Sequence, residues 1–134
     1  MAKQTGLGWT TLSCDNAAAA LQDIKNDITN LDFSTPYNQQ EVTGVDKFAV
    51  ERLQLLADFS GTLNAVFNPS ANRAHVVLGE GDMRVPRTLT LTVGGKTLSN
   101  EVLLTSYDLT RAAGGEFTTA SPFVLQDGTV PTWT

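Results

Sequence analysis

The sequence predicts a mainly β fold: an antiparallel β-sandwich or open barrel with a flanking α-helix and a long loop. Runs of alternating apolar and polar residues recur along the chain, and glycine-containing turns separate several of them. Only two short stretches have the spacing of a helix. We therefore expect about six or seven strands and one or two short helices in a single domain spanning residues 1–134.

The first third of the chain contains two predicted strands. Residues 8–14, GWTTLSC, are rich in strand formers, and residues 27–35 place Leu31 and Phe33 on one side of an extended chain. Residues 36–45, PYNQQEVTGV, are polar and show little periodicity, which predicts a long exposed connection. Loops of this length in compact domains are usually functional.

The apolar spacing changes after this loop. Phe48, Leu53 and Leu56 suit the principal helix of the fold, predicted over about residues 46–56, with Asp46 as its N-cap. Residues 57–69, ADFSGTLNAVFNP, then form the clearest strand in the sequence. One side of this strand is apolar and belongs to the core, so its polar side must face water, a partner or an enclosed space.

The second half begins with a short helix predicted within residues 68–82 and continues with an alternating strand, TLTLTV. Gly94-Gly95 predicts a tight hairpin that leads into a strand over about residues 97–111, apolar in part on both faces.

Further turns are predicted at Gly114-Gly115 and Asp127-Gly128, with a strand beginning near Phe117 between them. Pro122 lies within this last strand, which predicts an edge position or a bulge because proline cannot donate a ladder hydrogen bond.

Composition excludes several functions. The chain has 9 basic and 14 acidic residues, a net charge of −5, and a pI near 4.6. This balance argues against tight binding to nucleic acid phosphates or anionic lipid. The single Cys14 cannot form an internal disulfide and is expected to be a small buried hydrophobe. No stretch has the length of a signal-peptide core or a membrane span, so we expect no membrane partner.

No group of residues predicts catalysis. His75 is the only histidine, and we expect it to be solvated or to cap a helix. The acidic pairs Glu80/Asp82 and Asp23/Asp27 lack the full ligand spacing of a calcium loop. We therefore expect no enzyme activity, no metal and no cofactor. Most aromatic residues occupy core positions, but Tyr37 lies in the polar connection and is a candidate interface anchor.

Two long segments carry a family resemblance. NDITNLDFSTPYNQQEVTGVDKFAVERLQLLADFSGTLNAVFNP and TLTVGGKTLSNEVLLTSYDLTRAAGGEFTTASPFVLQDGTVPTW resemble the tail tube (major tail) proteins of long-tailed, siphovirus-type bacteriophages and prophages of actinobacteria. The resemblance covers residues 24–134. These features identify a building block of a virion and contain no catalytic motif.

The resemblance implies that six subunits form a ring and that stacked rings form the tail tube, the conduit for genome delivery into the bacterial host. It implies a virion protein, assembled in the host cytoplasm, whose partners are its own copies and the tape measure, tail terminator and distal tail proteins. DNA would be met only in transit, without specific binding.

In that family the inner sheets of neighbouring subunits join into one barrel, so the polar side of residues 57–69 is expected to face the lumen. The sequence leaves open whether this strand, the 101–111 strand or both line the channel. The candidate lumen-facing residues are Asp58, Ser60, Thr62, Asn64 and Asp108. The candidate inter-subunit loop is represented by Tyr37, Asn38, Gln39, Gln40 and Glu41.

A different class of function competes with this one. A small virion or surface binding module, such as a capsid decoration protein or an adhesin-like sandwich, has the same expected fold. An enzyme on a sandwich fold is the least favoured alternative. Assembly size separates the first two, because a tube subunit forms rings or filaments whereas a binding module remains a small oligomer.

Overall fold

The computed structural model describes residues 3–134, and this part of the chain contains ten strands and one helix. In chain order they are β1 (Thr11–Asp15), β2 (Leu21–Asp23), β3 (Ile28–Ser34), β4 (Tyr37–Glu41), β5 (Arg52–Ala57), β6 (Ser60–Val66), α1 (Ala74–Gly79), β7 (Arg87–Val93), β8 (Lys96–Leu104), β9 (Asp108–Arg111) and β10 (Phe117–Leu125). The mainly β, antiparallel fold with a short helix confirms the predicted class.

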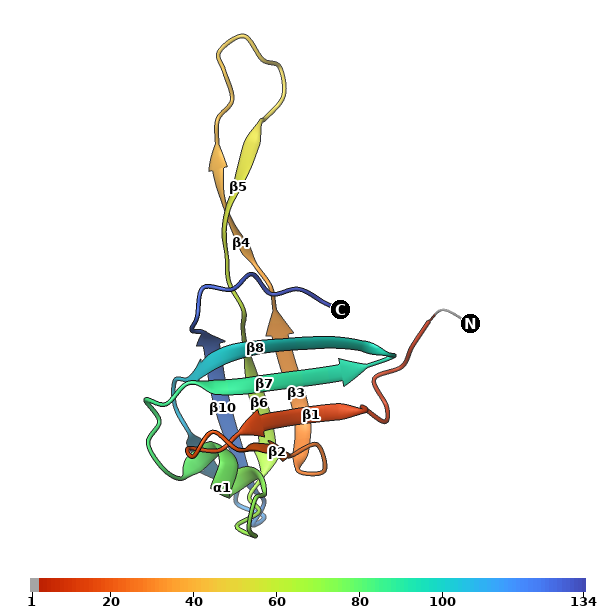
Figure 1. The fold of residues 1–134 in the computed structure, drawn as a ribbon, viewed down its shortest axis with the longest axis vertical. Helices are drawn as coiled ribbons and strands as arrows, with labels where there is room; N and C mark the ends of the chain where they lie inside the picture. The colour runs from red at the N-terminus through yellow and green to blue at the C-terminus, as the bar shows by residue number, and fades with distance from the viewer. Residues whose placement is uncertain (1–2) are drawn as a thin grey trace.

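The body of the protein is one sheet folded over on itself. Its strand order is β2-β1-β7-β8-β10-β6-β3, with β9 also paired to β10. In Figure 1, β1, β7 and β8 run across the view, whereas β3, β6 and β10 run along the long axis. We call the first group, with β2, the front layer and the second group, with β9, the back layer. The layers meet where β8 pairs with the end of β10.

The core lies between the two layers. Leu89, Leu91 and Leu98 of the front layer and Leu63 and Phe123 of the back layer are buried. An aromatic cluster continues this core, because the ring of Phe59 lies 5.2 Å from Phe123 and 6.1 Å from Phe33, measured between centroids. Alternation along each strand therefore places apolar side chains inside and leaves a polar outer face on each layer.

Two turns follow directly from the sequence. Gly94 and Gly95 join β7 to β8, and their φ angles of 59° and 78° are those of a two-residue hairpin turn that favours glycine. The turn at Gly114-Gly115 likewise joins β9 to β10. Both positions match the prediction.

Helix α1 lies within residues 68–82, where the sequence predicts a short helix. Its first amide, on Ala74, donates to Oδ2 of the buried Asp27 at 3.1 Å, and the side-chain amide of Asn68 donates to Oδ1 at 2.9 Å. At the other end, the buried guanidinium of Arg87 donates to the carbonyls of Val77 and Asp15. Distant side chains thus satisfy both ends of this short helix.

The principal helix predicted over residues 46–56 is wrong. Residues 52–57 form β5, and residues 42–51 form the outer end of the hairpin between β4 and β5. The segment Arg52-Leu53-Gln54-Leu55 alternates with period two as well as fitting a helix, and pairing with β4 decides in favour of the strand. A helix there would also have lacked a core, since every residue from Gly44 to Leu56 is exposed.

The predicted loop at residues 36–45 is also corrected. It is exposed as expected, but Tyr37–Glu41 form β4 and are not irregular. The strand escaped detection because β4 has no apolar face: all five of its residues are exposed, so no alternation marks it.

The strand predicted over residues 97–111 divides into β8 and β9, which belong to different layers. Pro122 explains the division. It lies inside β10, opposite Thr62, and its carbonyl accepts a hydrogen bond from the amide of Thr105 at 2.9 Å. Because the missing N–H of a proline points to the same side as its carbonyl, it faces the gap between β8 and β9. The edge or bulge predicted at Pro122 is therefore wrong.

Gly61 is a position where any side chain should damage the fold. A Cβ there would lie 2.1 Å from the carbonyl oxygen of Asp32 and 2.7 Å from Cα of Phe33, both backbone atoms of the paired strand β3. We predict that Gly61→Ala destabilises the protein by about 3 kcal/mol and lowers Tm by roughly 10 °C in thermal unfolding.

Gly6→Ala is the matched control, because a Cβ at Gly6 has no atom within 4 Å. A Gly61→Ala protein with the same Tm as the Gly6→Ala protein would contradict the close approach of β3 to β6.

Candidate functional site

The outer face of the back layer gathers polar side chains from four strands. The registers place Asn64 opposite both Asn30 and Ala120, and Ala120 opposite Asp108. Directly opposed residues share one face of a sheet, and the alternate residues Leu63 and Phe123 point into the core. We call the outer surface the polar face; its residues are Asn30, Asp32, Ser34, Ser60, Thr62, Asn64, Val66, Asp108, Thr110, Thr118, Ala120, Pro122 and Val124.

The polar face carries mostly short side chains and is anionic. Its two charged residues are Asp32 and Asp108, and it contains no lysine or arginine. The Asp32 carboxylate accepts a hydrogen bond from the amide of Thr62 at 3.1 Å, and that of Asp108 accepts one from the Ser106 hydroxyl at 3.1 Å. These bonds orient the carboxylates while leaving both residues exposed.

Four of the five candidate lumen residues come together on the polar face: Ser60, Thr62 and Asn64 from β6, and Asp108 from β9. Asp58 precedes β6 and is exposed. Its carboxylate accepts a hydrogen bond from the amide of the next residue, Phe59, at 2.8 Å. Because β9 lies in the same layer as β6, both segments named in the sequence analysis contribute to one surface.

Sequence reasoning missed the contribution of β3 to this face. Asn30, Asp32 and Ser34 extend it beyond β6. The alternation of Asp32 with Leu31 and Phe33 was the available signal, but the pairing of β3 with β6 is not visible in the sequence.

The outer face of the front layer is polar in a different way. Its hydroxyls hydrogen-bond to one another, Thr90 with Ser99 and Thr92 with Thr97, each at 3.0 Å, and Thr88 donates to Glu101. Side chains that satisfy each other in this way offer fewer free groups to a partner than the carboxylates of the polar face.

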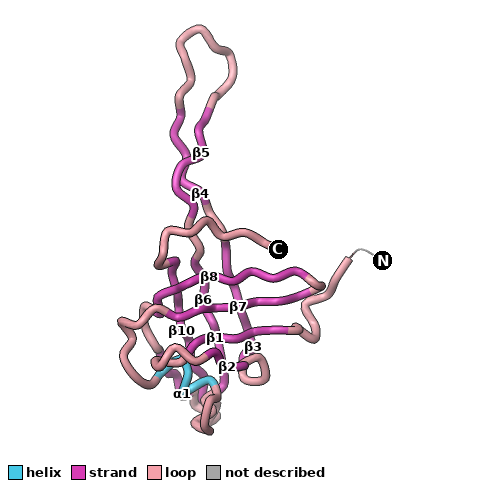
Figure 2. The backbone as a smooth tube through the Cα atoms, in the orientation of Figure 1, coloured by secondary structure: helices cyan, strands magenta, loops and turns pink. Residues whose placement is uncertain are grey.

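A second feature is the arm, which we define as residues 37–57. β4 and β5 with their connection project away from the body, as Figures 1 and 2 show. Beyond the strands, the Val42 amide donates to the Glu51 carbonyl at 2.8 Å and the Glu51 amide donates to Oγ1 of Thr43 at 2.8 Å. All of the candidate interface residues, Tyr37 to Glu41, belong to β4.

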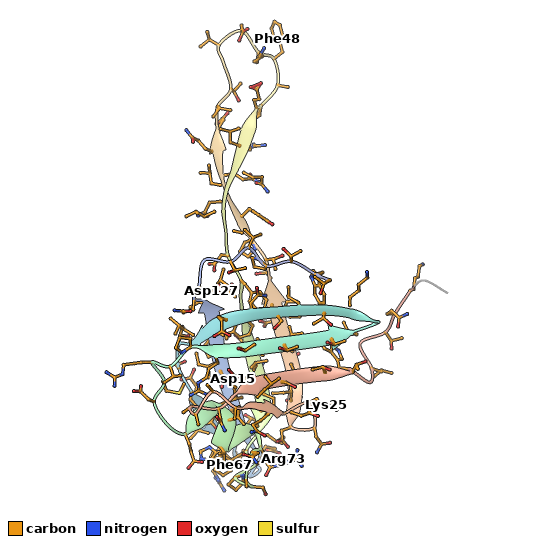
Figure 3. All side chains as sticks on the ribbon, in the orientation of Figure 1. Asp15, Lys25, Phe48, Phe67, Arg73 and Asp127 are labelled. Atoms are coloured by element: carbon orange, nitrogen blue, oxygen red, sulfur yellow. The ribbon has the colours of Figure 1, made fainter. Side chains whose placement is uncertain are left out.

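Apolar side chains are exposed along the arm. Val45 and Phe48 at its tip have relative exposures of 108% and 107%, and Figure 3 shows Phe48 at the far end of the molecule. Leu53, Leu55 and Leu56 are exposed nearer the body. A two-stranded hairpin is marginally stable alone, and exposed apolar side chains of this kind are typical of contact sites.

A groove of about 650 Å³ lies along β3, whose core-side residues Ile28 and Leu31 and polar-face residue Asn30 all line it. The residues before β1 and those of β1 and β3 line it, among them Trp9, Leu12, Ile28 and Leu31, with Lys25 at its rim. A smaller hollow of about 380 Å³ lies at the base of the arm beside Leu56 and Val130.

The titratable groups singled out in the sequence have structural roles. Nδ1 of His75 hydrogen-bonds the Tyr107 hydroxyl at 2.9 Å, and burial raises the pKa of Tyr107. Cys14 is buried as predicted, and burial raises the pKa of its thiol to about 12, so the thiol remains protonated at neutral pH.

Three members of the acidic pairs considered as metal ligands have other partners. Asp82 pairs with Arg84 at 2.8 Å, Asp23 pairs with Lys25 at 3.7 Å, and Asp27 binds the start of α1. Within residues 3–134, no three His, Cys, Asp or Glu side chains lie close enough together to hold a metal ion. In the same range, no helix has the length and apolar character needed to cross a membrane.

Comparison with known proteins gives a match at the level of fold. No family model matches the sequence, and no curated protein matches it. Among solved structures, a chain from the tail of an empty gene transfer agent particle, determined by helical refinement with C6 symmetry, has a TM-score of 0.71 at 15% identity, covering 98% of this chain and 99% of that chain.

A chain from the virion of a native gene transfer agent particle has a TM-score of 0.65 at 13% identity, covering 97% of this chain and 99% of that chain. At these identities the likeness concerns the fold over nearly the whole length of both chains. The fold of residues 3–134 is therefore one that is found in the tail and virion of gene transfer agents.

Proposed function

We propose that this protein is a structural subunit that self-assembles into stacked hexameric rings, forming a phage-type tail tube through which a genome passes into a bacterial host. The observation that carries this proposal is the polar face, a surface of four strands without a cation and with a free strand at each edge. The fold shared with a chain of a C6-symmetric tail supports it. The protein would function in the virion, after assembly in the host cytoplasm.

The polar face suits the wall of a DNA channel. Each lysine or arginine that contacts a phosphate adds salt-sensitive affinity, and many such contacts along a tube would hold the genome in place. A face that carries Asp32 and Asp108 among short neutral side chains repels the duplex weakly and gives it nothing to grip. DNA is thus met in transit and without specific contacts.

The strand edges suit closure into a ring. An open sheet exposes unpaired amides and carbonyls at its edges, and a head-to-tail contact with the correct rotation removes them by closing the sheet. Both β3 and β9 end the back layer in this way. A closed ring of back layers would place the polar faces together on one side.

The arm suits contacts between subunits of adjoining rings. The paired strands β4 and β5 and their connection carry the tip of the arm away from the body, as Figure 1 shows, where a neighbouring subunit could meet it. Burial of Val45 and Phe48 on a neighbour would remove from water the most exposed large apolar side chains of residues 3–134. The ends of the tube would meet other tail proteins, namely tape measure, terminator and distal tail components of a siphovirus-type particle of actinobacteria.

Electron microscopy of the purified protein at rising concentration tests the proposal. We predict rings with six-fold symmetry and, at higher concentration, tubes of constant diameter with an open channel. A defined small oligomer without a channel at every concentration would contradict the proposal and favour a small binding module.

The tip of the arm is predicted to be required for stacking. Val45→Ser combined with Phe48→Ser should leave the fold and its Tm unchanged, because both side chains are fully exposed. Tubes should shorten to rings, because the apolar contact between rings is lost; micrographs and sedimentation measure this.

The control is Asp46→Ser combined with Lys47→Ser, which alters two exposed polar residues of the same tip. Tubes of normal length from the Val45→Ser, Phe48→Ser protein would remove the tip from the stacking contact.

The charge of the channel gives another prediction. Asp32→Lys combined with Asp108→Lys replaces both carboxylates of the polar face at exposed positions, so the protein should still fold while the channel gains two cations per subunit. Assembled tubes of this variant should bind double-stranded DNA at low salt and release it steeply as salt rises, as measured by co-sedimentation.

Glu80→Lys combined with Asp127→Lys is the matched control, with the same change in net charge at exposed positions off the polar face. Equal DNA binding by the two variants would mean that Asp32 and Asp108 do not face the channel.

A further inference from the structure

Residues 126–134, which we call the strap, lie across the outer edge of β8 in the front layer. Figure 1 shows this segment between β8 and the base of the arm. β8 pairs with β7 along one side, but on its other side it pairs with β10 only over residues 102–104. No other strand of the described chain lies beside residues 97–101. Such an edge carries backbone amides and carbonyls that can pair with another chain.

Three backbone hydrogen bonds hold the strap on this edge. Thr97 and Thr134 exchange both of theirs, each at 2.9 Å, and the Gln126 amide donates to the Glu101 carbonyl at 3.0 Å. Because backbone groups alternate in direction along a strand, those of Ser99 point to the same side as those of Thr97. No strap residue bonds to the backbone of Ser99, so the strap meets the edge at its two ends and arches over the middle.

One aromatic contact and one buried proline anchor the strap to the body. The Trp133 ring lies 6.2 Å from that of Phe33, and Phe33 also lies 6.5 Å from Trp9, measured between centroids. Pro131 is buried, whereas Trp133 and Val130 have relative exposures of 41% and 54%. Val130 borders the hollow at the base of the arm and is loosely packed. The strap is therefore held by few contacts, and the largest side chain among them is Trp133.

We propose that the strap is a detachable cover of the β8 edge, which prevents residues 97–101 from pairing with a second copy of this chain. When attached, it occupies the outward groups of Thr97 and Glu101 and shields those of Ser99. When it detaches, the same edge of two copies can pair antiparallel about a two-fold axis. This inference goes beyond the proposed tube, because it concerns the single subunit before assembly.

Hydrogen exchange of dilute, unassembled protein tests the attachment. Trp133→Ser removes the aromatic anchor, so the Thr97 amide should exchange at least about tenfold faster than in the parent protein. The Leu98 amide, which faces Leu91 of β7, should keep its protection. Val130→Ser is the matched control, because it changes an apolar residue of the same strap that has no anchoring contact, and it should alter neither amide. Unchanged exchange of Thr97 in a folded Trp133→Ser protein would overturn the proposal.

Sedimentation velocity tests the consequence of detachment. Trp133→Ser should form dimers and larger species at a concentration at least about tenfold below that needed by the parent or by Val130→Ser. Ser99→Pro added to Trp133→Ser should abolish this association, because proline removes the outward amide and is tolerated at a strand edge. Association no stronger than that of Val130→Ser, association that Ser99→Pro leaves unchanged, or six-fold rings in place of dimers would each overturn the proposal.

Thr134→Pro is a second variant that leaves the aromatic cluster intact. It removes the amide that donates to the Thr97 carbonyl, so it should also speed the exchange of the Thr97 amide and promote association. If circular dichroism shows that Trp133→Ser does not fold, a folded Thr134→Pro protein with neither effect would overturn the proposal. Failure of the parent protein to form rings at high concentration would contradict the tube alone, because the tests of the strap use the dilute subunit.

Discussion

The ladder between β6 and β10 is the constraint on which the rest of the structure depends. Seven residue pairs join Ser60–Val66 to residues 118–124, and this ladder is the centre of the back layer. Because side chains alternate along both strands, the same pairs place Phe123 and Leu63 in the core and Thr62 and Asn64 on the polar face. A shift of one residue would reverse both faces at once.

The ladder also fixes the two features that we assign to assembly. β3 approaches β6 closely at Gly61, and β9 joins β10 below Pro122, so that the layer ends in two short free strands. The arm leads directly into β6 through Asp58 and Phe59, and Phe59 is fully buried beside Phe123. The Asp58 amide also donates to the Pro36 carbonyl at 2.9 Å, which ties the two ends of the arm together.

Sequence and structure agree where local chemistry decides the conformation. The Gly94-Gly95 turn, the alternating strands and the buried Cys14 follow from residue type and spacing. The prediction failed at residues 46–56, where helix and strand periods both fit and the choice rests on pairing with β4. It also failed at Pro122, since the gap between β8 and β9 that accommodates a proline is a product of tertiary structure.

The candidate site, like the fold, could be predicted from the sequence only in part. The polar side of residues 57–69 is visible in the sequence, but its union with Asn30, Asp32 and Asp108 depends on contacts between distant strands. A free strand edge or a groove leaves no recognisable pattern in the local sequence. The comparison with known structures adds that this fold is shared with chains of a gene transfer agent tail and virion.

The most direct measurement is a cryo-electron microscopy reconstruction of the assembled protein at a resolution that traces individual strands. Our account predicts six copies around an open channel, with Asn30, Thr62, Asn64 and Asp108 on the channel wall and the arm reaching the next ring. A reconstruction in which the polar face lies on the outer surface of the assembly, or in which the copies enclose no channel, would contradict it.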